Sequence, residues 1–183
     1  FTKFGGGSAV QPTGGSTTIL GAIPYADGVV VCAGTSIYFS QTGTSWLEIN
    51  RASVASSGDN HTAFTGRSVA ARTGQGQCQF ALFESATSDY GTLIISDGAN
   101  EPFFFRMEGT GANINTRTFF AGEITVTGTK SVEYVTVHDK HLIAAGVEDN
   151  LNTIFFSGTL DPTDFTSTGS GSIALEDQIK GIK

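Results

Sequence analysis

The hydrophobic positions of this chain fall into short runs with the spacing of strands. Gly, Thr, Ser and β-branched residues interrupt every window in which apolar residues recur at helical spacing, so no helix is predicted. The runs that persist are four to six residues long and are separated by turn-forming pairs such as Asp27–Gly28 and Asp97–Gly98. This pattern predicts an all-β protein. The predicted strands are Val29–Ala33, Ile37–Ser40, Trp46–Ile49, Ser68–Arg72, Cys78–Phe83, Thr92–Ser96, Phe103–Met107, Glu123–Val126, Val132–Val137, Leu142–Ala145 and Ile154–Ser157.

Small and polar residues gather in three stretches that we expect to be loops. Gly5–Thr18 is rich in Gly, Ser, Thr and Pro, and residues 1–22 are assigned to a lead-in before the folded part. A less pronounced linker is predicted at Gly109–Thr116, and a further loop is predicted at Ser167–Ser172. The folded part is therefore expected to begin near residue 23.

The strongest signal is a repeated unit. The segment Asp27–Gly34 (DGVVVCAG) aligns with Asp139–Gly146 (DKHLIAAG) at an offset of 112 residues (139 − 27). Each copy is followed by a strand that ends in two aromatic residues and a serine, Ser36–Ser40 or Thr153–Ser157, and later by a single aromatic residue. The residues that define the repeat are Gly34, Tyr38, Phe39, Ser40, Trp46, Gly146, Phe155, Phe156, Ser157, Asp161, Pro162 and Phe165.

A weaker unit between the two copies brings the number of units to three, at about residues 23–62, 63–112 and 113–183. Units of roughly 40–50 residues with about four antiparallel strands have the size of β-propeller blades, and blades bury their faces against neighbouring blades. Known propellers close with at least about four blades. We therefore predict antiparallel blade-like repeats that form a partial β-propeller, or one that a partner completes. A β-sandwich or barrel is the alternative.

Aromatic residues often occur in adjacent pairs or triples. Because neighbours on a strand face opposite sides of a sheet, these pairs predict strands that are buried on both faces, as between stacked sheets. They favour core packing over an exposed sugar-binding platform. The residues concerned are Tyr38, Phe39, Phe103, Phe104, Phe105, Phe119, Phe120, Phe155 and Phe156.

Composition narrows the classes of function. The formal net charge is −7 and the Lys and Arg residues are scattered, so the chain has no basic stripe with which to grip nucleic acid. An acidic surface is compatible with a channel through which DNA slides without sticking. No apolar run approaches the ~18 residues of a membrane-spanning helix.

The two cysteines are expected to be buried free thiols. Cys32 and Cys78 each lie in a strand-like context, in which cysteine behaves as a small hydrophobic residue. A single disulfide is the alternative, since the spacing does not decide between them.

The residues capable of catalysis or metal binding form no recognisable set. The chain has no Gly-x-Ser-x-Gly motif and no assignable arginine cluster of the kind that a sialidase-type propeller needs. His138 and His141 are expected to point in different directions. The acidic loops Asp161–Asp164 and Glu148–Asn150 are expected to be turns whose carboxylates accept backbone N–H bonds, with Ca²⁺ binding as the alternative. We therefore predict no enzyme activity, no cofactor and no metal site.

One part of the chain resembles a family of phage proteins. The runs Val135–Gly146, Asn152–Ser157 and Leu160–Phe165 are similar to a blade motif of podovirus (short-tailed phage) tail nozzle proteins, also called tail tubular proteins B. His141 and Phe165 stand where that family usually has Arg and Trp.

The beginning of the chain carries a second similarity. Phe1–Gly5, Asp27–Val31 and Thr35–Ser40 resemble the start of the propeller in the same proteins and in related packaged-DNA stabilisation proteins. Thr92–Gly98 resembles an internal strand–Asp–Gly hairpin of that family.

The resemblance implies a structural virion protein of a phage tail. Such proteins form rings, usually of six copies, that extend the tail tube, and viral DNA passes through the lumen during ejection without sequence-specific binding. The implied partners are other copies of the chain, adaptor or portal-side proteins and tail fibres, and the implied location is the virion. Members of the family are longer than 183 residues, so a longer chain is also implied.

The alternative function is a carbohydrate- or receptor-binding β-module of a phage tail or surface protein. Aromatic and Asp-rich loops motivate it, with Trp46 and the strand Phe103–Phe105 as the candidate contact residues.

Overall fold

The protein is built from β-strands throughout the part of the chain that can be described. The computed structural model describes residues 18–43, 46–49, 72–74, 76–84, 90–109 and 117–182, and this part contains twelve strands and no helix. It therefore offers no apolar helix of the length that crosses a membrane. The strands form three four-stranded sheets with antiparallel neighbours, which confirms the prediction of an all-β, antiparallel fold.

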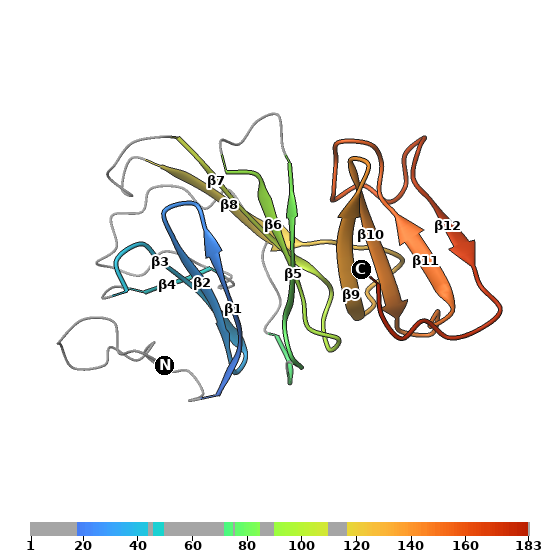
Figure 1. Ribbon diagram of the computed structural model, residues 1–183, viewed down its shortest axis with the longest axis horizontal. Coiled ribbons are helices and arrows are strands. Elements are labelled where there is room, and N and C mark those ends of the chain that lie inside the picture. The colour runs from blue at the N-terminus through green and yellow to red at the C-terminus, as the bar shows by residue number, and fades with distance from the viewer. Residues whose placement is uncertain are drawn as a thin grey trace.

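Each sheet is a meander in which strands that follow one another along the chain are neighbours. Sheet 1 contains β1 (Ile19–Tyr25), β2 (Gly28–Ala33), β3 (Ser36–Ser40) and β4 (Leu47–Glu48). Sheet 2 contains β5 (Gln79–Phe83), β6 (Thr92–Ser96), β7 (Phe103–Glu108) and β8 (Thr118–Glu123). Sheet 3 contains β9 (Val132–His138), β10 (His141–Val147), β11 (Thr153–Phe156) and β12 (Gly171–Ala174). Figure 1 shows the three sheets side by side in chain order, from blue to red.

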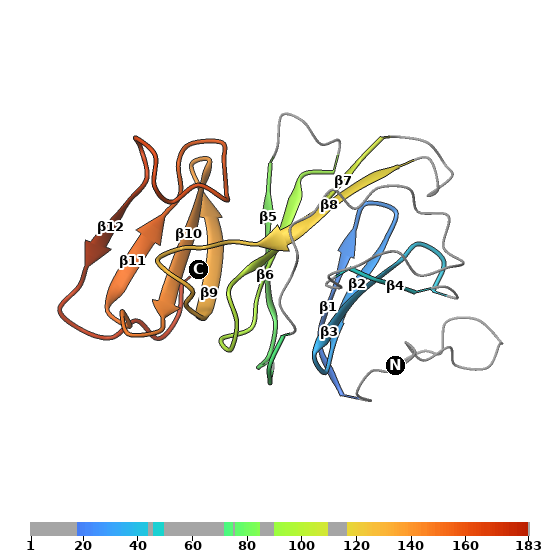
Figure 2. The same ribbon diagram turned by 180° about the vertical axis from the view of Figure 1, so that it is seen from behind.

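Sheet 2 lies between the other two sheets (Figures 1 and 2) and contributes residues to a buried apolar cluster on each of its faces. Along β6, Leu93 and Ile95 join an apolar cluster shared with sheet 1, whereas Ile94 joins a second cluster shared with sheet 3. Along β7, Phe105 belongs to the first cluster and Phe104 packs against the second. This division follows from the alternation of side chains along a strand. It confirms, for β7, that adjacent aromatic residues mark a strand buried on both faces.

Tyr25, the last residue of β1, anchors sheet 1 to sheet 2. Its hydroxyl donates a hydrogen bond to the carbonyl of Gly91 (2.7 Å) and accepts one from the N–H of Met107 (3.2 Å). Its ring lies 5.4 Å, centroid to centroid, from that of Phe105. Both polar functions of this buried side chain are thus satisfied across the junction, as burial of a tyrosine hydroxyl requires.

Some predicted strands are wrong. The pattern predicts a strand at Glu123–Val126, but β8 ends at Glu123. Ile124 and Val126 are buried residues of the second cluster that lie outside the strand ladder, so their alternation reflects burial alone. β1 and β12 are not predicted, because Gly, Pro and Ser within them read as loop.

The boundaries of the repeated units differ as well. β1 begins at Ile19, within the stretch 1–22 that the sequence assigns to a lead-in. β8 completes sheet 2, although residues 113–183 are assigned to the third unit. Several predicted segments lie outside the described residues: 1–5, 5–17, 68–71 and 110–116.

The sequence repeat is present in the structure with its register moved by one residue. Tyr25 pairs with Gly28 across the β1–β2 turn, and His138 pairs with His141 across the β9–β10 turn. Tyr25 therefore corresponds to His138, an offset of 113 (138 − 25) in place of 112. A shift of one residue moves every side chain of a strand to the opposite face. Equivalent residues of sheets 1 and 3 are therefore those that occupy the same place in the strand pairing, not those aligned by the sequence repeat.

Candidate functional site

The aromatic residues of the repeat occupy equivalent positions in sheets 1 and 3. Phe39 on β3 pairs with Val30, and Phe156 on β11 pairs with Ile143. Phe39 points toward sheet 2 and is fully buried in the first cluster. Phe155 packs toward sheet 2, so its neighbour Phe156 lies on the opposite face of sheet 3, where it is half-buried. The face that carries Phe39 in sheet 1 is therefore covered by sheet 2. The equivalent face of sheet 3, which carries Phe156, is covered by none of the described strands.

The other repeat residues differ more between the two copies. Tyr38 and Trp46 belong to a small third cluster on the face of sheet 1 that is turned away from sheet 2. Gly34 and Gly146 both have positive φ, at 60° and 64°. Gly34 lies in the β2–β3 turn, whereas Gly146 lies within β10 between residues that pair with β9. The aligned glycines therefore share a backbone conformation but not a place in the fold.

Two buried serines close the ends of equivalent strands. Ser157, which follows β11, accepts the N–H of Leu142 (3.0 Å) and donates to the carbonyl of Gly158 (3.0 Å). Ser40, at the end of β3, accepts the N–H of Gly43 (2.8 Å). Both hydroxyls satisfy backbone groups at the point where a strand ends, and this explains why a small hydroxyl residue recurs after each aromatic pair.

The acidic loop after β11 is held by its own carboxylates. Asp161 accepts hydrogen bonds from the N–H (2.9 Å) and hydroxyl (2.7 Å) of Thr163. Asp164 accepts the N–H groups of Thr166 (2.9 Å) and Ser167 (3.0 Å). Hydrogen bonds from the Ser167 side chain and the Thr166 backbone lower the pKa of Asp164 to about 2. The prediction of a turn stabilised by Asp side chains is confirmed. The remaining repeat residues of this loop are Pro162, which is buried, and Phe165, which packs against the second cluster.

The expectation that His138 and His141 point in different directions is wrong. The two residues flank a two-residue turn and are direct cross-strand partners, so their side chains lie on the same face of sheet 3. His141 Nδ1 donates to the carbonyl of Ser157 (2.6 Å), and its Nε2 lies 3.4 Å from the hydroxyl of Thr159. Both ring nitrogens of His141 therefore face groups of the neighbouring loop. Within the described ranges, no group of three or more potential metal-binding side chains is found.

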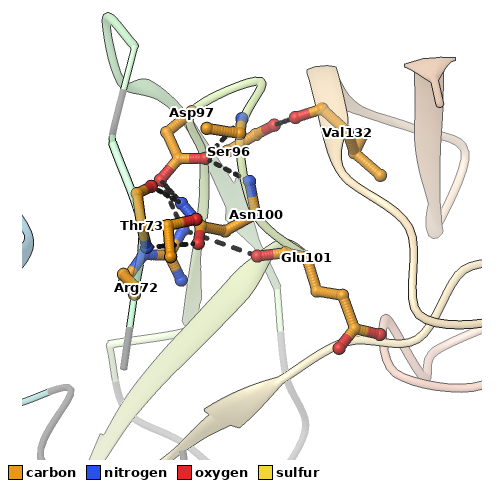
Figure 3. Close-up of polar contacts among 8 residues, drawn as sticks. Arg72, Thr73, Ser96, Asp97, Asn100, Glu101 and Val132 are labelled. Carbon is orange, nitrogen blue, oxygen red and sulfur yellow. Dashed lines mark hydrogen bonds and ion pairs between the residues drawn. The ribbon is translucent and has the colours of Figure 1, made fainter. Parts of the chain in front are cut away.

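A cluster of hydrogen-bonded polar side chains lies where sheets 2 and 3 meet, at the β6–β7 turn (Figure 3). We call residues 97–101 the Asp97 loop. Asp97 Oδ1 accepts the N–H groups of Ala99 (3.0 Å) and Asn100 (2.9 Å). Its Oδ2 accepts hydrogen bonds from Arg72 Nη2 (2.7 Å) and Asn100 Nδ2 (2.9 Å). The Arg72 and Asp97 side chains are both fully buried.

Arg72 and Thr73 bring a separate segment of the chain to this turn. Asn100 accepts the N–H of Thr73 (3.0 Å) and donates to its carbonyl (3.0 Å). The Arg72 guanidinium lies 5.8 Å from the centroid of the Phe103 ring. The segment 72–74 is therefore held by a buried ion pair, an amide side chain and an aromatic face.

The same loop reaches sheet 3 through backbone groups. Gly98 donates its N–H to the carbonyl of Val132 (3.0 Å), and Val132 donates its N–H to the carbonyl of Asn100 (3.2 Å). The Ser96 hydroxyl donates to the same Val132 carbonyl. The Asp97 loop thus joins three segments: residues 72–74, sheet 2 and the first strand of sheet 3.

The hydrogen-bonding groups of the carboxylate and the amide are engaged within the protein. A carboxylate offers about four acceptor positions, and Asp97 uses four. Asn100 uses its carbonyl oxygen and both amide hydrogens within the cluster. The cluster is therefore a structural joint between sheets.

Sequence reasoning recognises Asp97–Gly98 as a turn but misses the joint. Arg72 appears only as the end of a predicted strand, and it is not part of a strand in the structure. Its partner Asp97 lies 25 residues away, and no local sequence pattern predicts that the two residues pair.

Comparisons with known proteins add no relatives. No protein-family model matches the sequence, and neither the curated proteins nor the solved structures yield a match.

Proposed function

We propose that this chain is a non-catalytic structural subunit of a short-tailed phage tail. Its three stacked sheets act as blades of a propeller that a neighbouring copy of the subunit completes, and the assembly forms part of the wall around the DNA-conducting channel. The motifs described above that resemble those of tail nozzle proteins support a location in the tail. The acidic net charge of −7 suits a channel wall to which DNA does not bind.

The observation that carries the proposal is an apolar face at the end of the stack that none of the described strands covers. We call it the open face of sheet 3. Ile143 and Phe156 on this face are equivalent to Val30 and Phe39 of sheet 1, both of which are 0% exposed against sheet 2. Ile173, opposite Ile154 on the same face, is 55% exposed. The residues of the open face include Tyr134, Thr136, His138, His141, Ile143, Ile154, Phe156 and Ile173.

A further β-sheet is the occupant that fits this face. The equivalent face of sheet 1 already packs on a four-stranded sheet, so the geometry needed is the one the chain uses at its first junction. None of these residues is an acid, a lysine or an arginine, and the two histidines lie at one end of the face beside the β9–β10 turn, so a covering sheet removes apolar surface from water over the rest of the face. A β-sheet of a neighbouring subunit continues the stack in the same manner.

The polar side chains support a structural role. The carboxylates of Asp97, Asp161 and Asp164 are engaged by the protein itself, in turns and in the joint between sheets. The strand Phe103–Phe105 does not favour glycan binding, because Phe103 and Phe105 are 0% exposed in the core.

The proposal is tested by the protein content of virions and by the state of the purified protein. Mass spectrometry of purified particles should detect the chain as a stoichiometric virion component, and analytical ultracentrifugation of the full-length gene product should show a stable ring-sized oligomer. A monodisperse monomer that is absent from particles would overturn the proposal.

Two matched substitutions distinguish a specific effect of the open face on oligomerisation from the effect of adding a lysine elsewhere on the surface. Phe156→Lys should weaken oligomerisation strongly, because it places a charge in the interface. Leu82→Lys is the control, since Leu82 is 54% exposed but lies on sheet 2. If both variants assemble like the unmodified protein, the open face is not the interface.

A further inference from the structure

Cys32 and Cys78 are brought together at the junction of sheets 1 and 2. Gly21 on β1 is the cross-strand partner of Cys32 on β2. A Cβ atom added at Gly21 would lie 3.0 Å from the Cβ of Cys78. The N–H of Cys78 donates to the carbonyl of Leu20 at 3.0 Å. The missing side chain of Gly21 therefore makes the space in which the two cysteines approach each other.

Both thiols are buried in the apolar cluster that sheets 1 and 2 share. Cys32 is 0% and Cys78 is 7% exposed, and both are free, as the sequence predicts. The neighbouring Cys78 side chain, followed by burial, raises the pKa of Cys32. Because Gly21 pairs with Cys32 and a Cβ at Gly21 would lie 3.0 Å from the Cβ of Cys78, the two cysteines approach each other closely enough for a disulfide to form after a local adjustment.

We propose that Cys32 and Cys78 form an oxidisable pair whose disulfide cross-links sheet 1 to sheet 2. The inference does not depend on the proposed function. It rests on the approach of the two residues over Gly21 and on their joint burial at a junction between sheets.

The oxidation is a thiol–disulfide exchange with a small-molecule disulfide such as oxidised glutathione. The thiolate of Cys78, the more exposed residue, attacks the small disulfide and releases one thiolate, which takes up a proton. Cys32 then loses its proton and attacks the Cys78 sulfur of the mixed disulfide, which releases the second small thiol. Two protein thiols are oxidised and one small disulfide is reduced to two thiols, so atoms and electrons balance.

The same geometry predicts a slow reaction in the folded protein. The thiolate is the attacking species, and a raised pKa of Cys32 keeps it protonated at neutral pH. Refolding in a glutathione redox buffer removes this barrier, because the thiols are accessible before the core closes. The native contact then sets the equilibrium.

The test is to refold the reduced protein across a series of ratios of oxidised to reduced glutathione. After acid quenching, intact mass should show the loss of two hydrogen atoms, and peptide mapping should identify the Cys32–Cys78 linkage. The oxidised protein should unfold at higher denaturant concentration than the reduced protein, with an increase in the folding equilibrium constant of about 30- to 1,000-fold.

Controls and contrary outcomes are distinct. Cys32→Ala and Cys78→Ala should each give only glutathione adducts and no gain in stability on oxidation. The unmodified protein remains informative if a variant does not fold. Free thiols throughout the series, adducts without a linked peptide, or an oxidised form less stable than the reduced one would each overturn the proposal.

Discussion

Arg117 and Asp27, which are 90 positions apart, form a two-pronged ion pair that joins sheet 2 to sheet 1. Arg117 Nη1 lies 2.6 Å from Asp27 Oδ1, and Nη2 lies 2.8 Å from Oδ2. The Arg117 side chain is only 3% exposed and stacks at 5.5 Å from the centroid of the Tyr90 ring. Asp27 sits in the β1–β2 turn and also accepts a hydrogen bond from Gln41 (2.6 Å). A turn acid of the sequence repeat is thus a bridge between sheets.

Asp27→Asn should reduce stability at neutral pH by about 1 kcal/mol, because the Asp27 side chain is 37% exposed and solvent screens part of the interaction. The hydrogen bond from Arg117, together with its charge, lowers the pKa of Asp27 below 3.8. The stability that this ionised group contributes is therefore present above the unfolded-state pKa and is lost as pH falls through the lower folded-state pKa. The free energy of unfolding, measured with urea between about pH 2 and 7, should fall less steeply toward acid pH for the variant than for the unmodified protein. If the free energies of unfolding of the two proteins depend on pH in the same way, the pKa of Asp27 is not lowered by Arg117.

Asp97→Asn and Arg72→Met should each destabilise the protein by about 3–5 kcal/mol, because each leaves a fully buried charge without its partner. The double variant should cost less than the sum of the single changes, since it removes both charges. Chemical denaturation of the four proteins gives the coupling energy. Additive costs would show that the pair does not act as a unit.

Gly28→Ala should be among the most damaging small substitutions. A Cβ at Gly28 would lie 2.4 Å from the backbone oxygen of Ser40 and 2.7 Å from the Phe39 ring, so β2 and β3 would have to separate. We expect a loss of about 3 kcal/mol. Gly128→Ala is the matched control, since nothing lies within 4 Å of that Cβ and only its φ of 60° is unfavourable. The control should lose about 1 kcal/mol, and equal losses in thermal unfolding would count against steric contact as the cause.

Ser157→Ala tests the hydroxyl that ends β11. The change leaves the N–H of Leu142 and the carbonyl of Gly158 without this buried partner, and we expect a loss of about 1–3 kcal/mol. Ser172→Ala, on the exposed strand β12, should change stability by less than about 0.5 kcal/mol. Denaturant midpoints measure both, and a neutral Ser157→Ala would remove the structural reason for the recurring serine.

Strands that are apolar and continuous are visible in the sequence, and β2, β3, β6, β7, β9, β10 and β11 fall close to their predicted ranges. β12 is not visible, because Gly171 and Ser172 are in a strand only through pairing with Phe156 and Phe155 of β11. Such pairing is a tertiary contact, and strand propensity depends strongly on it. The acidic turn after β11 is local and is therefore predictable, whereas the Arg72–Asp97 joint is not.

The sequence by itself determined that the protein is all-β, that its units repeat and that the adjacent aromatic residues of β7 serve a strand buried on both faces. These properties depend on short-range alternation and on turn residues, which are read along the chain. Only the tertiary structure decided the register of the repeat, moved from 112 to 113, and with it which face of sheet 3 is open. It also decided that Cys32 and Cys78 approach each other over Gly21 and that Asp27 pairs with Arg117. A one-residue change in pairing exchanges the faces of a strand, and contacts between sheets follow from that choice.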